Sequence, residues 1–391
     1  MWKALEKWHN HLRTKSTPSF DVIKALTYLF WDIQEHGVDK RTTFTTGWMC
    51  PIFKKKDPTN ICNYRPITLL NTVYKLLTKV LVIQLLDHIS QIVHPDQAGF
   101  IPGQSIFDHI CLAKVILNYA EVSEENGSIV ALDQEKVYNK IRHNYLWKML
   151  EAFRLPQPFI KTVQALYHNV YTKVMINRVF SKSFKVKRGV CQGDPLSCPL
   201  FDLAIKPLAC WIHADPNIKG IEIPGIENVI KITLFVDNTN LFLSKDNQLD
   251  HIQQILDKWC KASGARFNIE KTEIIPVGKK SHRRSIHVTR KINPQDNEPL
   301  PPNIRIACNG EAVRILGLWI GNETNDQTPW ELILDVIKTK LNLWERAHLT
   351  LNGKCIVIQA IMGGHTQFLT KAQGMLPHIE KALMNIMSTF I

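Results

Sequence analysis

One short stretch, KITLFVDNTNLFLS at residues 231–244, places an acidic-polar pair between two apolar runs. The runs are Ile232–Val236 and Leu241–Leu243, and the pair is Asp237-Asn238. This pattern predicts a β-hairpin with a polar tip. A carboxylate at such a tip can hold a divalent metal ion against a phosphate group when a second carboxylate lies nearby.

The second carboxylate that we expect at this site belongs to Asp133, at the end of the strand predicted over GSIVALD. On the residues alone, Asp133 could equally be the N-cap of the helix that follows. Asp237 could equally be an ordinary turn residue. Asn238 offers a neutral carbonyl oxygen instead of an anion, so the pair carries only one acid.

The elements that must position these residues follow from the spacing of apolar side chains. Helices are predicted within 1–45, 71–91, 105–121, 137–150, 199–213 and 249–263, and over roughly 328–347 and 351–390. A hairpin is expected to turn at Asn177-Arg178, a strand is expected over 311–321, and residues 279–305 read as a basic, proline-rich loop. Because hairpins and helices are mixed, we expect an α+β fold whose small antiparallel sheet is backed by helices.

Composition limits the classes of protein that fit. A chain of 391 residues predicts two or three lobes, and a net charge of +13 favours a polyanionic partner, either nucleic acid or a membrane surface. No apolar run approaches the roughly 18–20 residues that span a bilayer. The nine cysteines lack zinc-finger spacing and predict reduced, mostly buried thiols of an intracellular protein, nuclear or cytoplasmic. The basic opening segment, residues 1–15, predicts a surface helix in preference to a transit peptide.

Seven blocks in a fixed order connect the chain to a known family. They are IFKKKDPTNICNYRPITLL, HPDQAGFIPGQSI, ALDQEKVYNKIRH, KRGVCQGDPLSCPLF, LFVDNTNLFL, SGARFNIEKTE and RILGLWIG. From about Trp48 to the C-terminus, the chain resembles the reverse transcriptase of non-LTR (LINE-type) retrotransposons.

The resemblance implies a right-hand polymerase with fingers, palm and thumb. The implied domains are N-terminal helices and fingers in 1–125, a palm in 126–325 and a partial thumb in 326–391. The palm would contain a fingers insertion around 150–190 and the basic loop 279–305. The implied partners are an RNA template, a DNA primer and deoxynucleoside triphosphates, with no membrane, and the oligomeric state stays open.

The resemblance also assigns roles to individual residues. Asp133 and Asp237 become ligands of a two-Mg²⁺ site, to which the backbone carbonyl of Gln134 adds, and Lys271 becomes the acid that protonates pyrophosphate. Arg65, which follows the lysine run 54–56, grips triphosphate or template. The alternatives are a solvent-facing strand lysine for Lys271 and a solvated turn for the lysine run.

Three further residues are implied to contact the nucleotide. Tyr138 would lie under the sugar of the incoming nucleotide, although an amphipathic helix also predicts a core aromatic there. Gln192 and Gly193 would contact the nucleotide through their loop, because glycine lets the backbone approach a ligand closely. An ordinary turn is the alternative for that pair.

Asn238 is the main departure from the family pattern, which has two successive aspartates at this point. Loss of this acid predicts impaired or absent polymerase activity and a weakened Mg²⁺ site. The alternatives are a non-catalytic protein that still binds nucleic acid and an unstable relic without function. The chain also lacks the endonuclease and Cys/His knuckle of such elements, so we expect a fragment of a retroelement.

Overall fold

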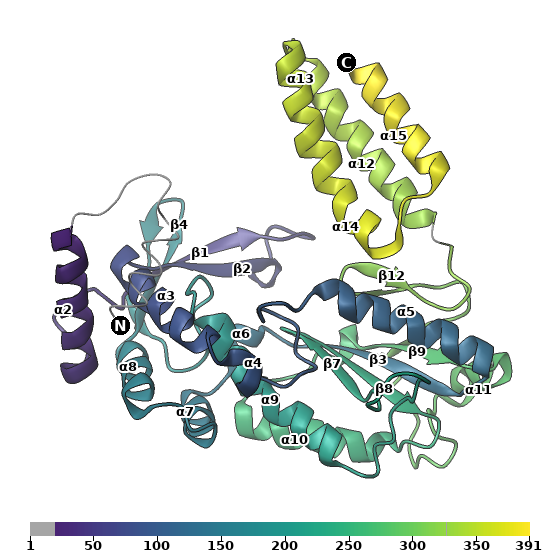
Figure 1. The fold of residues 1–391 in the computed structure, drawn as a ribbon, viewed down its shortest axis with the longest axis horizontal. Helices are drawn as coiled ribbons and strands as arrows, with labels where there is room; N and C mark the ends of the chain where they lie inside the picture. The colour runs from purple at the N-terminus through teal and green to yellow at the C-terminus, as the bar shows by residue number, and fades with distance from the viewer. Residues whose placement is uncertain (1–19, 326) are drawn as a thin grey trace.

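The computed structural model describes residues 20–325 and 327–391. The helix predicted for the opening 1–15 lies outside these residues. The described chain contains two five-stranded sheets, each packed with helices, and a separate helical bundle near the C-terminus (Figure 1). This arrangement confirms the α+β fold and agrees with the expected fingers, palm and thumb.

The first sheet combines two distant parts of the chain. Its strands are β1 (Gly47–Phe53), β2 (Tyr64–Leu69), β4 (Tyr171–Ile176), β5 (Val179–Phe180) and β6 (Phe184–Lys185). The order is β2-β1-β4-β5, with β6 paired to β4. The hairpin predicted at Asn177-Arg178 is confirmed, and both residues have left-handed φ values of 49° and 66°. The strands of 171–185 therefore extend the sheet that starts at residue 47.

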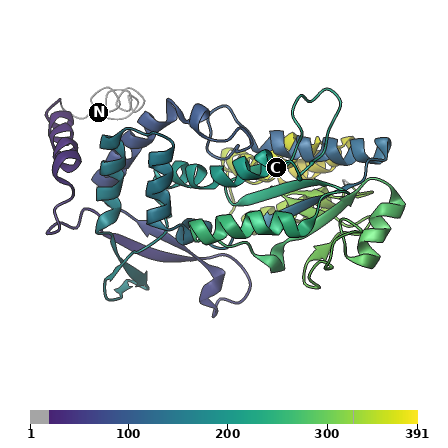
Figure 2. The same cartoon turned by 90° about the horizontal axis from the view of Figure 1, so that it is seen from below.

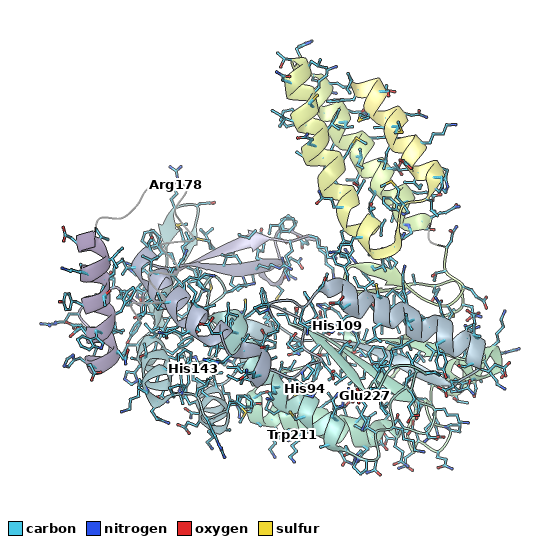
Figure 3. The ribbon with its side chains drawn as sticks, viewed as in Figure 1. His94, His109, His143, Arg178, Trp211 and Glu227 are labelled. Atoms are coloured by element: carbon cyan, nitrogen blue, oxygen red, sulfur yellow. The ribbon has the colours of Figure 1, made fainter. Side chains whose placement is uncertain are left out.

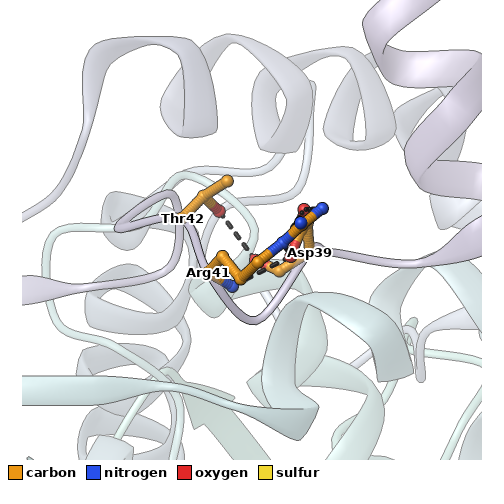
Figure 4. A network of polar contacts seen from close by, with 3 residues as sticks. All are labelled: Asp39, Arg41 and Thr42. Carbon is orange, nitrogen blue, oxygen red and sulfur yellow. Dashed lines mark hydrogen bonds and ion pairs between the residues drawn. The ribbon is translucent and has the colours of Figure 1, made fainter.

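Five helices surround the first sheet and the start of the palm. They are α2 (Phe20–His36), α3 (Thr72–Leu86), α4 (Ile89–Ile92), α7 (His143–Ala152) and α8 (Gln157–His168). On α2, Phe30 and Ile33 are buried as expected, whereas Leu29 is exposed. The turn after α2 is held by Arg41, which donates to the Asp39 carboxylate at 2.7 Å and lowers the pKa of Asp39 to about 2 (Figure 4).

The second sheet lies between two helical layers. Its order is β10 (Arg305–Ile306), β9 (Glu273–Val277), β3 (Gly127–Asp133), β8 (Asn238–Ser244) and β7 (Ile232–Phe235). All neighbours are antiparallel except β10 and β9. Helix α5 (Ile106–Ser123) packs on the face of Ile129, and α9 (Ser197–Ala214) and α10 (Leu249–Ser263) pack on the face of Val130, as the view in Figure 2 illustrates. Side chains of β3 alternate between these faces, so both faces are buried.

The bundle follows a short hairpin. Strands β11 (Val313–Ile315) and β12 (Leu318–Ile320) precede α12 (Thr328–Glu345), α13 (Leu351–Ile358), a π-helical segment (Gln359–Gly363), α14 (Gly364–Gln373) and α15 (Pro377–Phe390). Trp330, Ile337 and Leu341 of α12 are buried within it. The predicted single strand over 311–321 is therefore wrong, because the chain turns at Leu316-Gly317, where both φ values are positive. The helix predicted over 351–390 is also interrupted, at Gly374.

Two further predictions need correction. Residues 279–305 do not form a loop throughout, because Lys280–Thr289 is helix α11. Ile286 on this helix is buried, and the buried Arg283 donates to Glu323 at 3.2 Å, so a charged residue occupies a core position. The helix predicted over 137–150 is divided into α6 (Val137–Lys140) and α7, because Ile141 has extended dihedrals and its carbonyl accepts from Gly189.

Two further features are the hydrophobicity of the helices and the state of the cysteines. Among residues 20–325 and 327–391, none of the helices has both the length and the apolar character that crossing a bilayer requires. All nine cysteines are free thiols, as expected. The expectation that they are mostly buried is wrong, since Cys62, Cys111, Cys308 and Cys355 are exposed and the others are only partly covered.

Candidate active site

The predicted carboxylates meet at one end of the palm sheet. Strands β3 and β8 pair in a register that sets Asp133 directly opposite Asn238. Asp237 precedes Asn238 in the two-residue turn Val236-Asp237, which joins β7 to β8. Directly opposed residues of an antiparallel pair point to the same face. The hairpin is thus confirmed, and Asp133 and Asn238 face the same side of the sheet.

The turn that carries Asp237 is strained and supported from behind. Val236 has a φ of 56°, a conformation that a β-branched residue rarely adopts. Its backbone N–H donates to Oε1 of the buried Gln97 at 3.2 Å, and the same oxygen accepts from Gly99 at 2.9 Å. Strain of this kind persists only where the surroundings enforce it, so Gln97 supports the hairpin that carries Asp237.

Lys271 reaches the first carboxylate directly. It ends a 3₁₀ turn, Ile269–Lys271, so the alternative of a strand lysine does not hold. Its Nζ donates to Oδ2 of Asp133 at 2.7 Å, while the Lys271 side chain is 63% exposed and that of Asp133 is 33% exposed. A proton donor therefore lies in contact with one of the two carboxylates.

Acidic and basic side chains around Asp237 affect one another's pKa values. Burial and the negative charge of Asp133 raise the pKa of Asp237, and the positive charges of Arg65 and Lys271 oppose this shift. Burial, followed by the positive charges of Arg65 and Lys271, lowers the pKa of Lys54, and the two aspartates oppose it. Arg65 on β2 and Lys54 after β1 are thus cationic side chains of the fingers that lie near the carboxylates of the palm. Such a mixture suits a ligand that combines phosphate with a metal ion.

Tyr138 lies near these charged groups, on the short helix α6. Its hydroxyl shares a hydrogen bond of 3.4 Å with Sγ of Cys198, and its ring contacts that of Phe201 with centroids 5.8 Å apart. Burial and the bond to Cys198 raise the pKa of Tyr138, and the negative charge of Asp237 adds to the shift. The aromatic ring is only partly buried, so it adjoins the carboxylates without being enclosed in the core.

Gln192 and Gly193 connect the palm to the fingers sheet. The carbonyl of Gln192 accepts from the backbone N–H of Thr68 on β2 at 2.8 Å. Gly193 has a φ of 118°, and a Cβ at this residue would lie 2.5 Å from the Thr68 carbonyl oxygen. Only glycine permits this approach. The loop therefore sits against the strand that carries Arg65.

Gln134 follows Asp133 and is buried. Its side-chain Nε2 donates to Oγ1 of Thr239 at 3.3 Å, which fixes the side chain within the sheet. The proposed role of its backbone carbonyl stays a prediction, as do the roles of the other site residues. Sequence reasoning missed Gln97, whose only signal was a polar residue within the HPDQAGF block.

The donor set fits a hard divalent cation, although weakly. Asp133 and Asp237 supply carboxylate oxygens, which Mg²⁺ prefers, and burial together with their mutual repulsion raises the pKa of Asp237. A divalent cation relieves such repulsion. Asn238 supplies at most a neutral oxygen, and its Nδ2 lies 3.5 Å from Oδ1 of Asp237.

The fold and the paired carboxylates are those of a polymerase palm, and comparison with known families identifies which one. Residues 53–320 match the model of the family described as "Reverse transcriptase (RNA-dependent DNA polymerase)". The chain belongs to this family, which confirms the expected resemblance and the right-hand fold.

The relatives are proteins of retrotransposable elements, in agreement with the non-LTR type. The chain is 26% identical over 342 residues to the transposon TX1 uncharacterized 149 kDa protein of Xenopus laevis, covering 85% of this chain and 25% of that protein. It is 26% identical over 212 residues to the Pol polyprotein of element R2DM from Drosophila melanogaster, covering 54% and 19%. The chain thus spans about a quarter or less of these two relatives.

Solved structures that are similar to the chain include telomerases. The telomerase from Candida albicans, in complex with a fragment of telomeric RNA, has a TM-score of 0.46 at 12% identity. The match covers 94% of this chain and 65% of the telomerase chain. The corresponding Candida tropicalis complex has a TM-score of 0.44 at 14% identity, with coverages of 94% and 64%.

Proposed function

We propose that this chain binds an RNA template with a DNA primer and extends the primer at a strongly impaired rate. The observation that carries the proposal is the β3–β8 register, in which Asn238 faces Asp133 where the family pattern has an aspartate. Two carboxylates remain in place of three. The proposed domains are fingers within 1–125, palm within 126–325 and partial thumb within 326–391.

Mg²⁺ is the cofactor that we propose for Asp133 and Asp237. When bound, it would supply Lewis-acid stabilisation of phosphate charge. The protein's own groups then have separate tasks. Arg65 and Lys54 attract and orient the triphosphate, because a guanidinium can contact phosphate oxygens through two N–H groups. Lys271 can donate a proton to an oxygen that gains charge.

The remaining residues shape the nucleotide position. Tyr138, whose pKa is affected by the charge of Asp237, is proposed to lie beneath the sugar. Gln192 and Gly193 are proposed to contact the base and sugar from the loop that abuts Thr68. Their contacts with the fingers strand would make nucleotide binding sensitive to the position of β2.

The second candidate function is binding of nucleic acid without turnover. The net charge of +13 and the neutral Asn238 favour it. One pair of measurements separates the two candidates: anisotropy of a labelled primer annealed to RNA across a salt series, and extension of that primer with Mg²⁺ and deoxynucleotides. Our proposal predicts binding that weakens steeply with salt, together with slow extension. Binding without any extension would favour the second candidate, and failure to bind would contradict both.

Replacing Lys271 with methionine is expected to separate metal binding from chemistry. The amine competes with a metal for Asp133, and an exposed pair is worth about 0.2–1 kcal/mol, so the Mg²⁺ concentration for half-maximal rate should fall by about 1.4- to 5-fold. The maximal rate should fall by about 10²- to 10⁴-fold, because a general acid is lost. Extension rates across a Mg²⁺ series in the Asn238→Asp background measure both effects.

The matched control is Lys279→Met, which removes another lysine–carboxylate pair, 2.6 Å from Glu124. It should change neither quantity. If Lys271→Met lowers the melting temperature and leaves the Mg²⁺ dependence and maximal rate unchanged, the lysine is structural only.

A further inference from the structure

A second cluster of metal-binding side chains lies away from Asp133 and Asp237. His94 and Asp96 follow helix α4, and His213 lies in the last turn of α9; Figure 3 labels His94 beside that helix. Each residue offers one ligand atom, and these three atoms lie within 4.8 Å of one another. His213 Nε2 is 2.5 Å and His94 Nδ1 is 3.5 Å from Oδ2 of Asp96. All three side chains are partly buried, with exposures between 15% and 30%.

The chemistry of this cluster differs from that of the active site. Two imidazoles with one carboxylate suit a borderline transition-metal ion such as Zn²⁺, whereas Mg²⁺ prefers oxygen alone. Ligand atoms of a tetrahedral zinc lie about 3.3 Å apart, so shifts of about 1 Å or less would complete the geometry around Asp96. His94 Nδ1 accepts the Asp96 backbone N–H at 3.2 Å, so this nitrogen carries no proton, and a bound metal would take the place of that hydrogen bond.

The charge of Asp96 also influences two titratable side chains outside the cluster, His109 and Cys210. His109 on α5 is only 8% exposed, and its Nδ1 has no hydrogen-bond partner in the described part of the chain. Burial lowers the pKa of His109 and raises that of Cys210, which lies three residues before His213 on α9. The negative charge of Asp96 acts to raise the pKa of both side chains.

We propose that His94, Asp96 and His213 bind a zinc-type transition-metal ion that ties the segment after α4 to α9. This segment also supports the catalytic hairpin. The Asp96 carbonyl accepts from Leu234 N–H on β7 at 2.8 Å, the Leu234 carbonyl accepts from Ala98 at 3.0 Å, and Gln97 holds Val236. The metal therefore fixes the backbone from which Asp237 projects.

The competing explanation is an ordinary ion pair between Asp96 and His213. A zinc titration by calorimetry separates the two on the full-length chain, after removal of metals with a chelator and in excess Mg²⁺ to occupy the catalytic carboxylates. The proposal predicts a single high-affinity zinc per chain, a melting temperature that rises on zinc addition, and visible absorption of tetrahedral Co²⁺ when cobalt replaces zinc.

Substitution then locates the ion. His94→Asn and His213→Asn should each lose high-affinity zinc and the zinc-dependent rise in melting temperature, while circular dichroism of the metal-free variants shows that they fold. His287→Ala is the matched control, because His287 is a partly buried histidine whose imidazole nitrogen lies 3.8 Å from a cysteine sulfur, and it should keep both. Absence of high-affinity zinc binding, or its retention in both asparagine variants, would overturn the proposal and leave the ion pair alone.

Discussion

Replacing Asn238 with aspartate is expected to raise the rate of primer extension by at least about 10- to 100-fold, because losing even a group that only supports a metal ligand usually costs that much. The register places position 238 directly opposite Asp133 and next to Asp237. A new acid there would add a third carboxylate at this end of the sheet. Single-turnover extension of a primed RNA template with Mg²⁺ measures the effect.

The same substitution should make stability depend on Mg²⁺. Like charges directly opposed across two strands destabilise a sheet, so the metal-free variant should melt at a lower temperature than the natural chain. Added Mg²⁺ should restore the melting temperature of the variant and change that of the natural chain less. This readout does not require activity, so it tests the geometry even where other departures keep extension slow.

Asn297→Asp is the control, because it makes the same change of charge at an exposed residue of the segment after α11. It should alter neither extension nor the response to Mg²⁺. Rapid extension by the natural chain, at the rate of Asn238→Asp, would refute the claim that Asn238 impairs the site. Slow extension by both, with a clear Mg²⁺ response in the variant alone, would assign the defect to other residues.

Local signals explain which parts of the fold could be predicted. The strand that ends at Asp133, the hairpin around Asp237 and the helix that stops at Gly264 each depend on residues within one element. The spacing of apolar residues and the residue types at turns predict such elements directly. The α+β fold followed from their order and is confirmed.

Long-range contacts explain the errors. Helix α11 was mistaken for loop because its buried Arg283 reads as a surface residue, and the partner that makes burial possible, Glu323, lies 40 residues further on. Gln97 escaped notice for the same reason, since its partner Val236 is 139 residues away. Polar residues in a core are stabilised by partners that no local window contains.

The same distinction between local and long-range signals applies to the residues of the site. Asp133 and Asp237 were brought together by resemblance alone, and the structure adds the register that makes Asn238 the opposing residue. The contact between Lys271 and Asp133 could not be derived, because it joins a 3₁₀ turn to a strand end 138 residues apart. The roles of Tyr138, Gln192 and Gly193 stay predictions.

Asp133→Asn in the Asn238→Asp background is expected to lower the extension rate by about 10³-fold. A carboxylate that holds a catalytic metal contributes several kcal/mol of transition-state stabilisation, and each 1.36 kcal/mol changes a rate tenfold. The amide keeps the shape of the side chain, so the fold should persist. Single-turnover extension at saturating nucleotide measures the loss, and anisotropy should show unchanged binding of the primed template.

The control is Asp246→Asn, because Asp246 lies just beyond the opposite end of β8, where its 52% exposed side chain pairs with Lys219. It removes one negative charge near the same strand without touching the carboxylate cluster, so its rate should match that of the parent. Asp133→Asn also frees Lys271, whose amine then has no anionic partner at 2.7 Å. If the rate falls equally in both variants, net charge is responsible; if it falls in neither, Asp133 holds no catalytic metal and the palm end of the sheet is not the reaction centre.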